Sequence, residues 1–300
     1  MVYRLQVVDG NAQDTLNKVG VYAFIVLNLI GGLGMVVMLI IAALSSKVKR
    51  LPTWYSFCVS WAMSTASYLL LFITAEQFTQ TPIFYVCYVQ ASLIYAMPPT
   101  TTSTTLALLV QILLSFPDVT SDRPKKASLL ASVMLIMIPY TIFLFLFVGV
   151  SAFHTMKPDS LQKSHVGTYC DSSDSAWLRV SFSLVAGISL LILIVQALLI
   201  KKLYQSMRVL KSNPQSTATT IRGIVFTLLG FVSMVLAIFF VLVDKNDLPF
   251  DIILSTFPVL ALLVFGTQKD MFAWLLWKST TPYKSEGRGS VFFGKDQIRV

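Results

Sequence analysis

Long runs of apolar residues, separated by short polar segments, dominate the chain. A helix needs about 20 apolar residues to cross the hydrocarbon core of a bilayer. The runs that meet this requirement predict an all-α membrane protein, a seven-transmembrane helix bundle. The expected spans are Val19–Ser46, Leu51–Ala75, about Val86–Phe116, a segment within Ala127–Met156, Val180–Ile200, Gly223–Val243 and Asp251 to about Phe265.

Composition agrees with a membrane protein and argues against a soluble one. The mean hydropathy is +0.73, and only 12% of the residues are charged, whereas roughly 25% is usual in soluble domains. The net charge of +9 comes from basic residues that stand in short loops between apolar runs. This distribution is typical of membrane proteins rather than of nucleic-acid-binding ones. We therefore expect membrane lipid, and no nucleic acid, among the partners.

The basic residues also predict the orientation. If the N-terminus is outside, 17 of the 23 Lys and Arg residues fall on the cytoplasmic side, as the positive-inside rule requires. The expected organisation is an extracellular N-terminus (1–18), the seven-transmembrane bundle with an interfacial helix (19–278) and a cytoplasmic tail (279–300). The chain is then a multi-pass protein of the cell membrane, with its C-terminus in the cytoplasm.

Two of the three cysteines fall on the same side of the membrane in this orientation. Cys87 stands at the outer end of the third span, and Cys170 lies in the loop between the fourth and fifth spans. Both are then in an oxidising compartment, where a disulfide can form and persist. The alternative is two free thiols. Cys58 lies within the second span, where we expect a small packing residue.

Ionisable residues inside a bilayer usually mark function, and the expected spans lack them. All 14 acidic residues fall in loops, tails or helix ends, with Asp251 at the start of the seventh span. His154 and His165 lie in or beside the loop after the fourth span. This pattern argues against retinal proteins, ion pumps, intramembrane zinc hydrolases and haem-bearing bundles. We expect no enzyme activity, no metal site and no cofactor.

Neutral polar residues within the spans are the candidate ligand-binding positions. Pro98 and Pro99 are followed by six consecutive hydroxyl residues, and prolines free backbone carbonyls that hydroxyls can bond. The hydroxyls either form a wall of a ligand pocket or hold neighbouring helices together. The candidates are Gln90, Thr100, Thr101, Thr104 and Thr105, with Gln111 on the same stripe as Thr100 and Thr104.

The third cytoplasmic loop, Lys201–Arg222, contains five basic residues and no acidic one. It could contact a G protein or lipid headgroups, or it could only anchor the topology against the anionic inner leaflet. The candidate contact residues are Lys201, Lys202, Arg208, Lys211 and Arg222. After Gly266, the segment Lys269–Lys278 is predicted to be a short eighth helix in the membrane interface, or else a continuation of the seventh span.

Together, these features resemble a G-protein-coupled receptor: seven spans, an outside N-terminus, a cysteine pair, a basic inner loop and an interfacial helix. The stretches Pro52–Trp61 and Tyr95–Thr100 also look like receptor-like proteins of basidiomycete fungi. The chain departs from the rhodopsin-like class, however. Gln111-Ile112-Leu113 stands in place of the Asp-Arg-Tyr triplet, and of the Asn-Pro-x-x-Tyr element only Pro258 is kept. The resemblance is thus to a divergent class.

The resemblance implies a cell-surface receptor that senses an unknown extracellular ligand and signals to a heterotrimeric G protein. The alternative is a seven-helix transporter or facilitator of a small neutral solute, built from two three-helix repeats. Such transporters rely on prolines at matching positions of the two repeats. Here the mid-span prolines are in the third, fourth and seventh spans, at Pro98 and Pro99, Pro139 and Pro258. This arrangement favours the receptor.

Overall fold

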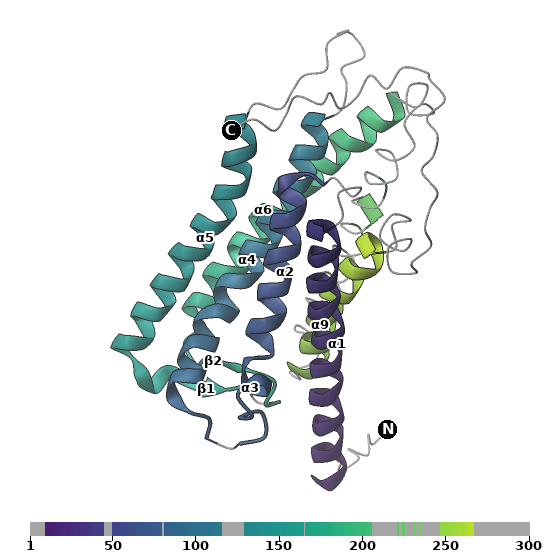
Figure 1. The fold of residues 1–300 in the computed structure, drawn as a ribbon. Coiled ribbons are helices and arrows are strands. Elements are labelled where there is room, and N and C mark those ends of the chain that lie inside the picture. Colours follow the sequence, from purple (N-terminus) through teal and green to yellow (C-terminus); the bar gives the residue numbers. More distant parts are fainter. Residues whose placement is uncertain are drawn as a thin grey trace, which may run out of the picture.

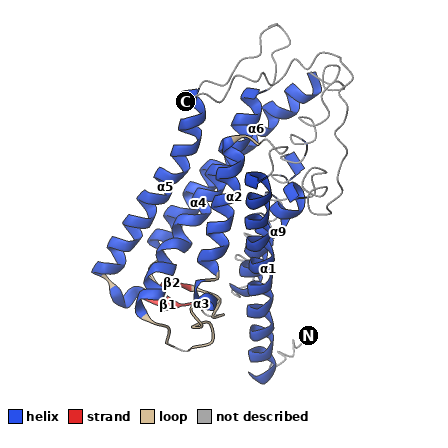
Figure 2. Ribbon diagram, viewed as in Figure 1, coloured by secondary structure: helices blue, strands red, loops and turns tan. Residues whose placement is uncertain are grey.

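A computed structural model shows a bundle of long helices with a small β-hairpin at one end (Figures 1 and 2). The structure describes residues 10–44, 50–79, 81–115, 129–164, 166–205 and 247–266, together with Ile221, Ile224, Val225, Leu228, Phe231 and Val235. The long helices are α1 (Gly10–Leu44), α2 (Pro52–Tyr68), α4 (Phe84–Ser115), α5 (Leu129–Met156), α6 (Ser175–Gln205) and α9 (Asp247–Gly266).

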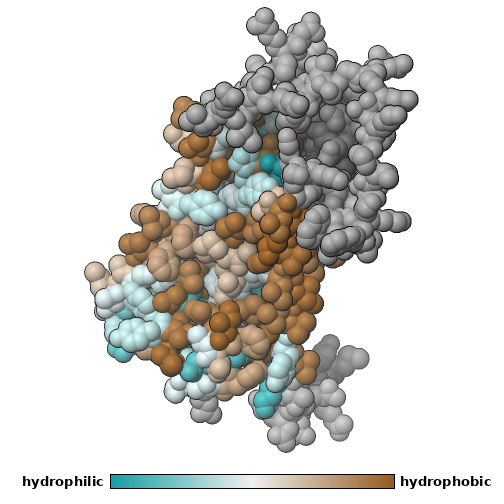
Figure 3. Space-filling view, viewed as in Figure 1, coloured by the Kyte–Doolittle hydropathy of each residue, from teal (hydrophilic) through white to brown (hydrophobic). Residues whose placement is uncertain are grey.

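Four of these helices are long and apolar enough to cross a membrane: α1, α5, α6 and α9. Many of their large apolar side chains are exposed; Phe145 of α5 is 72% exposed and Leu190 of α6 is 63% exposed. Contiguous apolar surface on this scale is not tolerated in water. Hydrophobic residues cover much of the face in Figure 3, and the most hydrophilic ones gather mainly toward the hairpin end. The chain is a membrane-embedded, multi-pass protein.

Helix α4 is the centre of the described bundle. It packs against α2, α5 and α6, while α1 packs against α2 and α9. More than half of the side chains of α4 are buried, which explains how a helix rich in hydroxyls is accommodated: protein, not lipid, surrounds it. The largest core cluster joins α1, α2, α4, α6 and α9 through residues such as Met35, Phe57, Leu108, Leu199 and Phe265.

Glycines bring α1 close to α9. A Cβ atom added to Gly31 would collide with the Cβ atom of Pro258, and one added to Gly34 would collide with the side chain of Leu262. Small residues permit this close approach of two helix backbones in membranes. The glycines of α1 therefore serve packing within the chain.

Several expected boundaries differ from those observed. Helix α1 begins at Gly10, nine residues before the expected start of the first span at Val19. The second expected span, Leu51–Ala75, is interrupted at Leu69 and continues as the single turn α3 (Leu70–Ile73). Just before the interruption, the carbonyl of Ser67 accepts a hydrogen bond of 3.0 Å from the side chain of Gln90 on α4.

Three expected segments fall largely or wholly outside the described residues. Of the sixth span, Gly223–Val243, the structure describes only some positions, all of them helical and apolar. The expected interfacial helix Lys269–Lys278 and the tail 279–300 lie outside the described residues as well.

Candidate functional site at the hairpin end of the bundle

A β-hairpin, which the sequence analysis did not predict, follows α5. The chain passes through the 3-10 turn η1 (Pro158–Ser160), after which β1 (Leu161–Lys163) pairs antiparallel with β2 (Cys170–Ser172). The turn between the strands includes Gly167 with φ +82°, a left-handed conformation that glycine adopts readily. Cys170 forms a disulfide with Cys87 in the first turn of α4, with 5.2 Å between their Cα atoms. The predicted disulfide is thus present, and it fastens the hairpin to α4.

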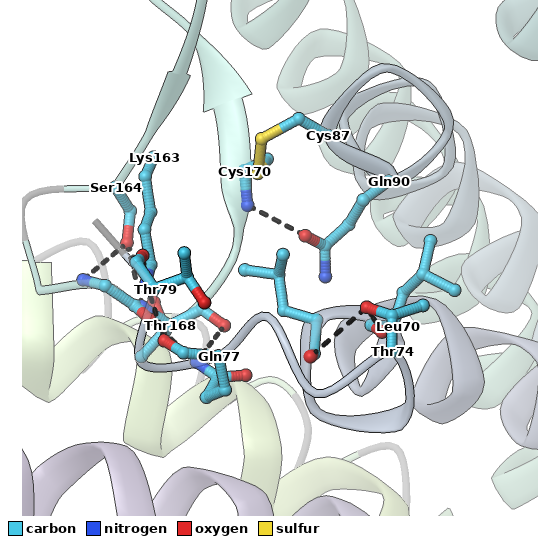
Figure 4. The surroundings of a disulfide bond; sticks show 12 residues. Leu70, Thr74, Gln77, Thr79, Cys87, Gln90, Lys163, Ser164, Thr168 and Cys170 are labelled. Atoms are coloured by element: carbon cyan, nitrogen blue, oxygen red, sulfur yellow. Dashed lines mark hydrogen bonds between the residues drawn. A yellow bond between two sulfur atoms is a disulfide. The ribbon is translucent and has the colours of Figure 1, made fainter. Parts of the chain in front are cut away.

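Gln90, one turn after Cys87, joins three elements of this end (Figure 4). Its Oε1 atom accepts a hydrogen bond of 2.9 Å from the backbone N–H of Cys170. Its Nε2 atom donates to the carbonyl of Ser67 at 3.0 Å, beside the interruption of α2. The side chain is fully buried. Gln90, a candidate ligand-binding residue, is therefore engaged with the protein's own backbone.

Asp251 connects the hairpin to α9. Because α9 begins at Asp247, Asp251 lies in its second turn rather than at its start, and its side chain is fully buried. The hydroxyl of Thr168 donates to its Oδ2 atom at 2.5 Å, and the hydroxyl of Tyr169 donates to its Oδ1 atom at 3.0 Å. Hydrogen bonds to a carboxylate are among the stronger ones in proteins. Asp251 thus lies near the outer end of its helix, as expected, but it is buried among residues of the hairpin.

Tyr169 is packed among aromatic rings as well as bonded to Asp251. Its ring lies 5.8 Å from that of Tyr68 and 6.3 Å from that of Phe24, measured between centroids. Burial raises the pKa of Tyr169 well above its ordinary value of 10.0, and the neighbouring Asp251 carboxylate adds to the rise. The phenol therefore stays protonated and can donate its hydrogen bond.

The loop between α3 and α4 forms the remaining side of this end. The Nε2 atom of Gln77 donates to the carbonyls of Gly167 and Thr168 at 2.7 and 3.1 Å. In return, the ammonium group of Lys163 donates to the carbonyls of Gln77 and Thr79 at 2.6 and 3.1 Å. Burial lowers the pKa of Lys163, and the Glu76 carboxylate opposes this shift. Each of the two segments, the hairpin and the α3–α4 loop, thus donates hydrogen bonds to backbone carbonyls of the other.

The predicted hydroxyl stripe of α4 bonds mainly to its own helix. Thr100 donates to the carbonyl of Ala96, and Thr101 to those of Met97 and Pro98. Thr104 and Thr105 both donate to the carbonyl of Thr101. These hydroxyls are thus satisfied within the helix, which lets them lie inside an apolar bundle.

Two contacts tie this stretch to other helices. The hydroxyl oxygens of Thr104 and Ser60, on α2, lie 2.7 Å apart. The carbonyl of Tyr95, four residues before Pro99, accepts a hydrogen bond of 2.9 Å from Ser181 on α6. Pro99 cannot donate to that carbonyl, so a neighbouring helix does so. The described contacts of the stripe are those of helix–helix packing.

Gln111, at the other end of the stripe, caps α2. Its Oε1 atom accepts hydrogen bonds from both the backbone N–H and the hydroxyl of Thr53, in the first turn of that helix. Helix N-termini have N–H groups without intrahelical partners, and a side-chain acceptor satisfies them. The cap here comes from a different helix.

The predicted basic surface is described only in part. Lys201 and Lys202 stand in the last turns of α6, and Lys201 is exposed. Arg208, Lys211 and Arg222 lie outside the described residues.

Two hollows open at the hairpin end. One is a groove of about 690 Å³ between the end of α5 and the start of α6, lined by Lys157, Asp159 and Asp174 among others. The other is a cavity of about 210 Å³ that is open to the surface and lined by α1, the α3–α4 loop and the hairpin. Within the part of the chain that the structure describes, no three His, Cys, Asp or Glu residues are grouped so that they could hold a metal ion.

The sequence analysis missed Asp251, Thr168, Tyr169, Gln77 and Lys163 as members of this end. One signal could have placed Asp251 inside a helix: proline is favoured in the first turn of a helix, and Pro249 stands in the first turn of α9. The pairing of Gln77 with the hairpin has no local signal, because about 90 residues separate the partners.

No protein-family model and no curated protein matches this sequence.

Proposed function

We propose that the chain is a cell-surface receptor of the G-protein-coupled type, with an extracellular N-terminus and a cytoplasmic C-terminus. It senses an extracellular ligand and signals to a heterotrimeric G protein. The observation that carries the proposal is the attachment of the hairpin to the central helix. The Cys87–Cys170 disulfide and Gln90 join the hairpin to α4, and Asp251 joins it to α9.

This arrangement gives a ligand two helices to act on. A ligand that contacts the hairpin from outside acts on a segment bonded to both α4 and α9. Since α4 also packs against α2, α5 and α6, a shift of its outer end repacks several helices. Packed helices switch between discrete arrangements rather than deform continuously, as a receptor requires.

The central place of α4 also favours the receptor over the transporter. Transporters of the repeat type bind their solute between two bundles near the membrane midplane. In the middle turns of α4, the hydroxyls bond to carbonyls of their own helix and to Ser60.

Nucleotide exchange tests the signalling. The purified chain in lipid nanodiscs should accelerate nucleotide exchange on one class of purified heterotrimeric G protein, relative to empty discs. Charge reversal of Lys201 and Lys202 to Glu should reduce the acceleration, whereas Lys157→Glu, near the hairpin, should not. No acceleration with any G-protein class, together with solute uptake by proteoliposomes, would favour the transporter.

Labelling of introduced cysteines tests the orientation. In intact cells, a membrane-impermeant maleimide should label Lys157→Cys, and it should label Lys201→Cys only after permeabilisation. The two lysines stand near opposite ends of the bundle, after α5 and near the end of α6. The reverse pattern would contradict the proposed orientation.

A further inference from the structure

The smaller cavity at the hairpin end combines positive charge with apolar walls. Its walls come from three separate parts of the chain: α1, the loop after α3 and the hairpin. Six of the lining residues are Lys18, Val21, Gln77, Phe78, Lys163 and Val166. Two of the six are cationic, and none of the described lining residues is acidic. An anion is therefore the complementary ligand.

Lys163 is held in position before any ligand arrives. Its ammonium group is half-buried and donates two hydrogen bonds, to the carbonyls of Gln77 and Thr79. An ammonium group has three donors, so one remains for a ligand. Because burial lowers the pKa of this group, an anion within bonding distance would favour its charged form. Glu76 also acts on Lys163, but it does not line the cavity.

The loop that presents these carbonyls is itself fixed. Gln77 is buried, and its amide nitrogen is bonded to the carbonyls of Gly167 and Thr168. The two parts of the wall thus hold one another. Such preorganisation reduces the entropy that binding must overcome.

The remaining walls suit a small apolar group. Val21 and Val166 contribute aliphatic surface, and the ring of Phe78 is 58% exposed while packing on Tyr22 at 5.4 Å. The volume of about 210 Å³ is below the range of about 300–1,000 Å³ that is usual for drug-sized ligands. The occupant must therefore be small.

We propose that this cavity binds a small monocarboxylic acid with an apolar tail. The carboxylate lies between the ammonium groups of Lys18 and Lys163, and the tail lies against Phe78, Val21 and Val166. The inference does not rest on the receptor proposal, because binding to the purified chain is measured without any signalling partner.

Three probes with the same phenyl tail test the charge. They are 3-phenylpropanoate, its neutral amide and 3-phenylpropylammonium, each titrated against the purified chain in detergent by ligand-observed NMR. Charged hydrogen bonds are about twice as strong as neutral ones, so the carboxylate should bind about tenfold more tightly than the amide. The ammonium compound should bind more weakly still. Equal affinities for the three, or no binding of the carboxylate at about 10 mM, would overturn the proposal.

Matched variants test whether the carboxylate binds in this cavity. Lys18→Gln should weaken 3-phenylpropanoate about fivefold or more, and Phe78→Ala should weaken the carboxylate and the amide alike. Lys157→Gln, an exposed lysine of the same end that lines the other hollow, should leave the affinity unchanged. An equal loss in Lys157→Gln and Lys18→Gln would mean nonspecific attraction to the surface, and would refute the site. All of these measurements use proteins whose thermal unfolding midpoint matches that of the wild type.

Discussion

The contact between α1 and α9 leads to a prediction in which two chemically identical substitutions have opposite effects. In a helix, Gly→Ala ordinarily stabilises by about 0.5–1 kcal/mol, because glycine loses more backbone entropy on folding. At Gly31, however, the new Cβ atom would collide with the Cβ atom of Pro258. It would also lie 3.0 Å from the carbonyl carbon of Pro258 and 3.1 Å from the nitrogen of Val259.

Relief of this collision requires the two helices to move apart, because part of what the methyl group meets is backbone. Overpacking of this kind costs about 1–3 kcal/mol, which exceeds the gain in helix propensity. We therefore expect Gly31→Ala to lower the free energy of unfolding by about 1–2 kcal/mol. Gly187 on α6 is the matched control, since a Cβ atom there meets no atom within 4 Å. Gly187→Ala should raise the free energy of unfolding by up to about 1 kcal/mol.

The chain provides its own reporter for the assay. Of its three cysteines, two form the disulfide, so the buried Cys58 is the free thiol. A dye that fluoresces on reaction with thiols should react with it as the bundle unfolds on heating. The expected result is a lower unfolding midpoint for Gly31→Ala and an equal or higher one for Gly187→Ala. If both variants shift the midpoint in the same direction, the close packing of α1 on α9 is not as described.

Three further predictions concern the hairpin and the α2 cap. Replacing both disulfide cysteines by serine removes a link across 83 residues; it should lower the free energy of unfolding by about 4 kcal/mol, and an unchanged unfolding midpoint would contradict this. Because its pKa is raised, Tyr169 keeps its proton in the folded state above pH about 10, whereas the unfolded chain loses that proton there. The free energy of unfolding should therefore fall as the pH rises past about 10. In Tyr169→Phe, the free energy of unfolding should fall less between pH about 9 and about 11. At neutral pH this variant should be less stable by about 1.5–3 kcal/mol, because the hydrogen bond to Asp251 is missing. Identical pH profiles for the variant and the wild type would count against this assignment. Gln111→Leu leaves Thr53 at the start of α2 without its acceptor and should cost about 1–2 kcal/mol, measured as a lower unfolding midpoint than that of the wild type.

The length of the charge-free runs was enough to predict the long helices that the structure describes. The third expected span, about Val86–Phe116, is observed as Phe84–Ser115, and the fifth, Val180–Ile200, lies within Ser175–Gln205. Helix α6 begins before the expected start at Val180, at Ser175, where Asp174 caps it. The carboxylate of Asp174 accepts a hydrogen bond of 2.9 Å from the N–H of Ala176.

The hairpin end could not be predicted in the same way. Strands of three residues are too short to show an alternating pattern. At the interruption of α2, the carbonyl of Ser67 is bonded by Gln90 from another helix, a contact that has no local signal in the sequence. Residues such as Gln90, Thr104 and Gln111 could be recognised as buried and polar, but sequence alone could not choose between a ligand and a helix as their partner. That choice depends on which helix lies opposite.

The composition of α4 has a consequence for how the protein enters the membrane. This central helix carries Pro98, Pro99 and a run of hydroxyl residues, and it is not among the helices that are apolar enough to cross a membrane by themselves. A nascent chain that ends just after α4 should therefore pass slowly from the translocon into lipid, because the helix has low hydropathy and lipid offers its freed carbonyls no partners. Stable integration of α4 should wait until α5 and α6, its later neighbours, have been synthesised. The helix that organises the finished bundle is then the one whose insertion most depends on the others.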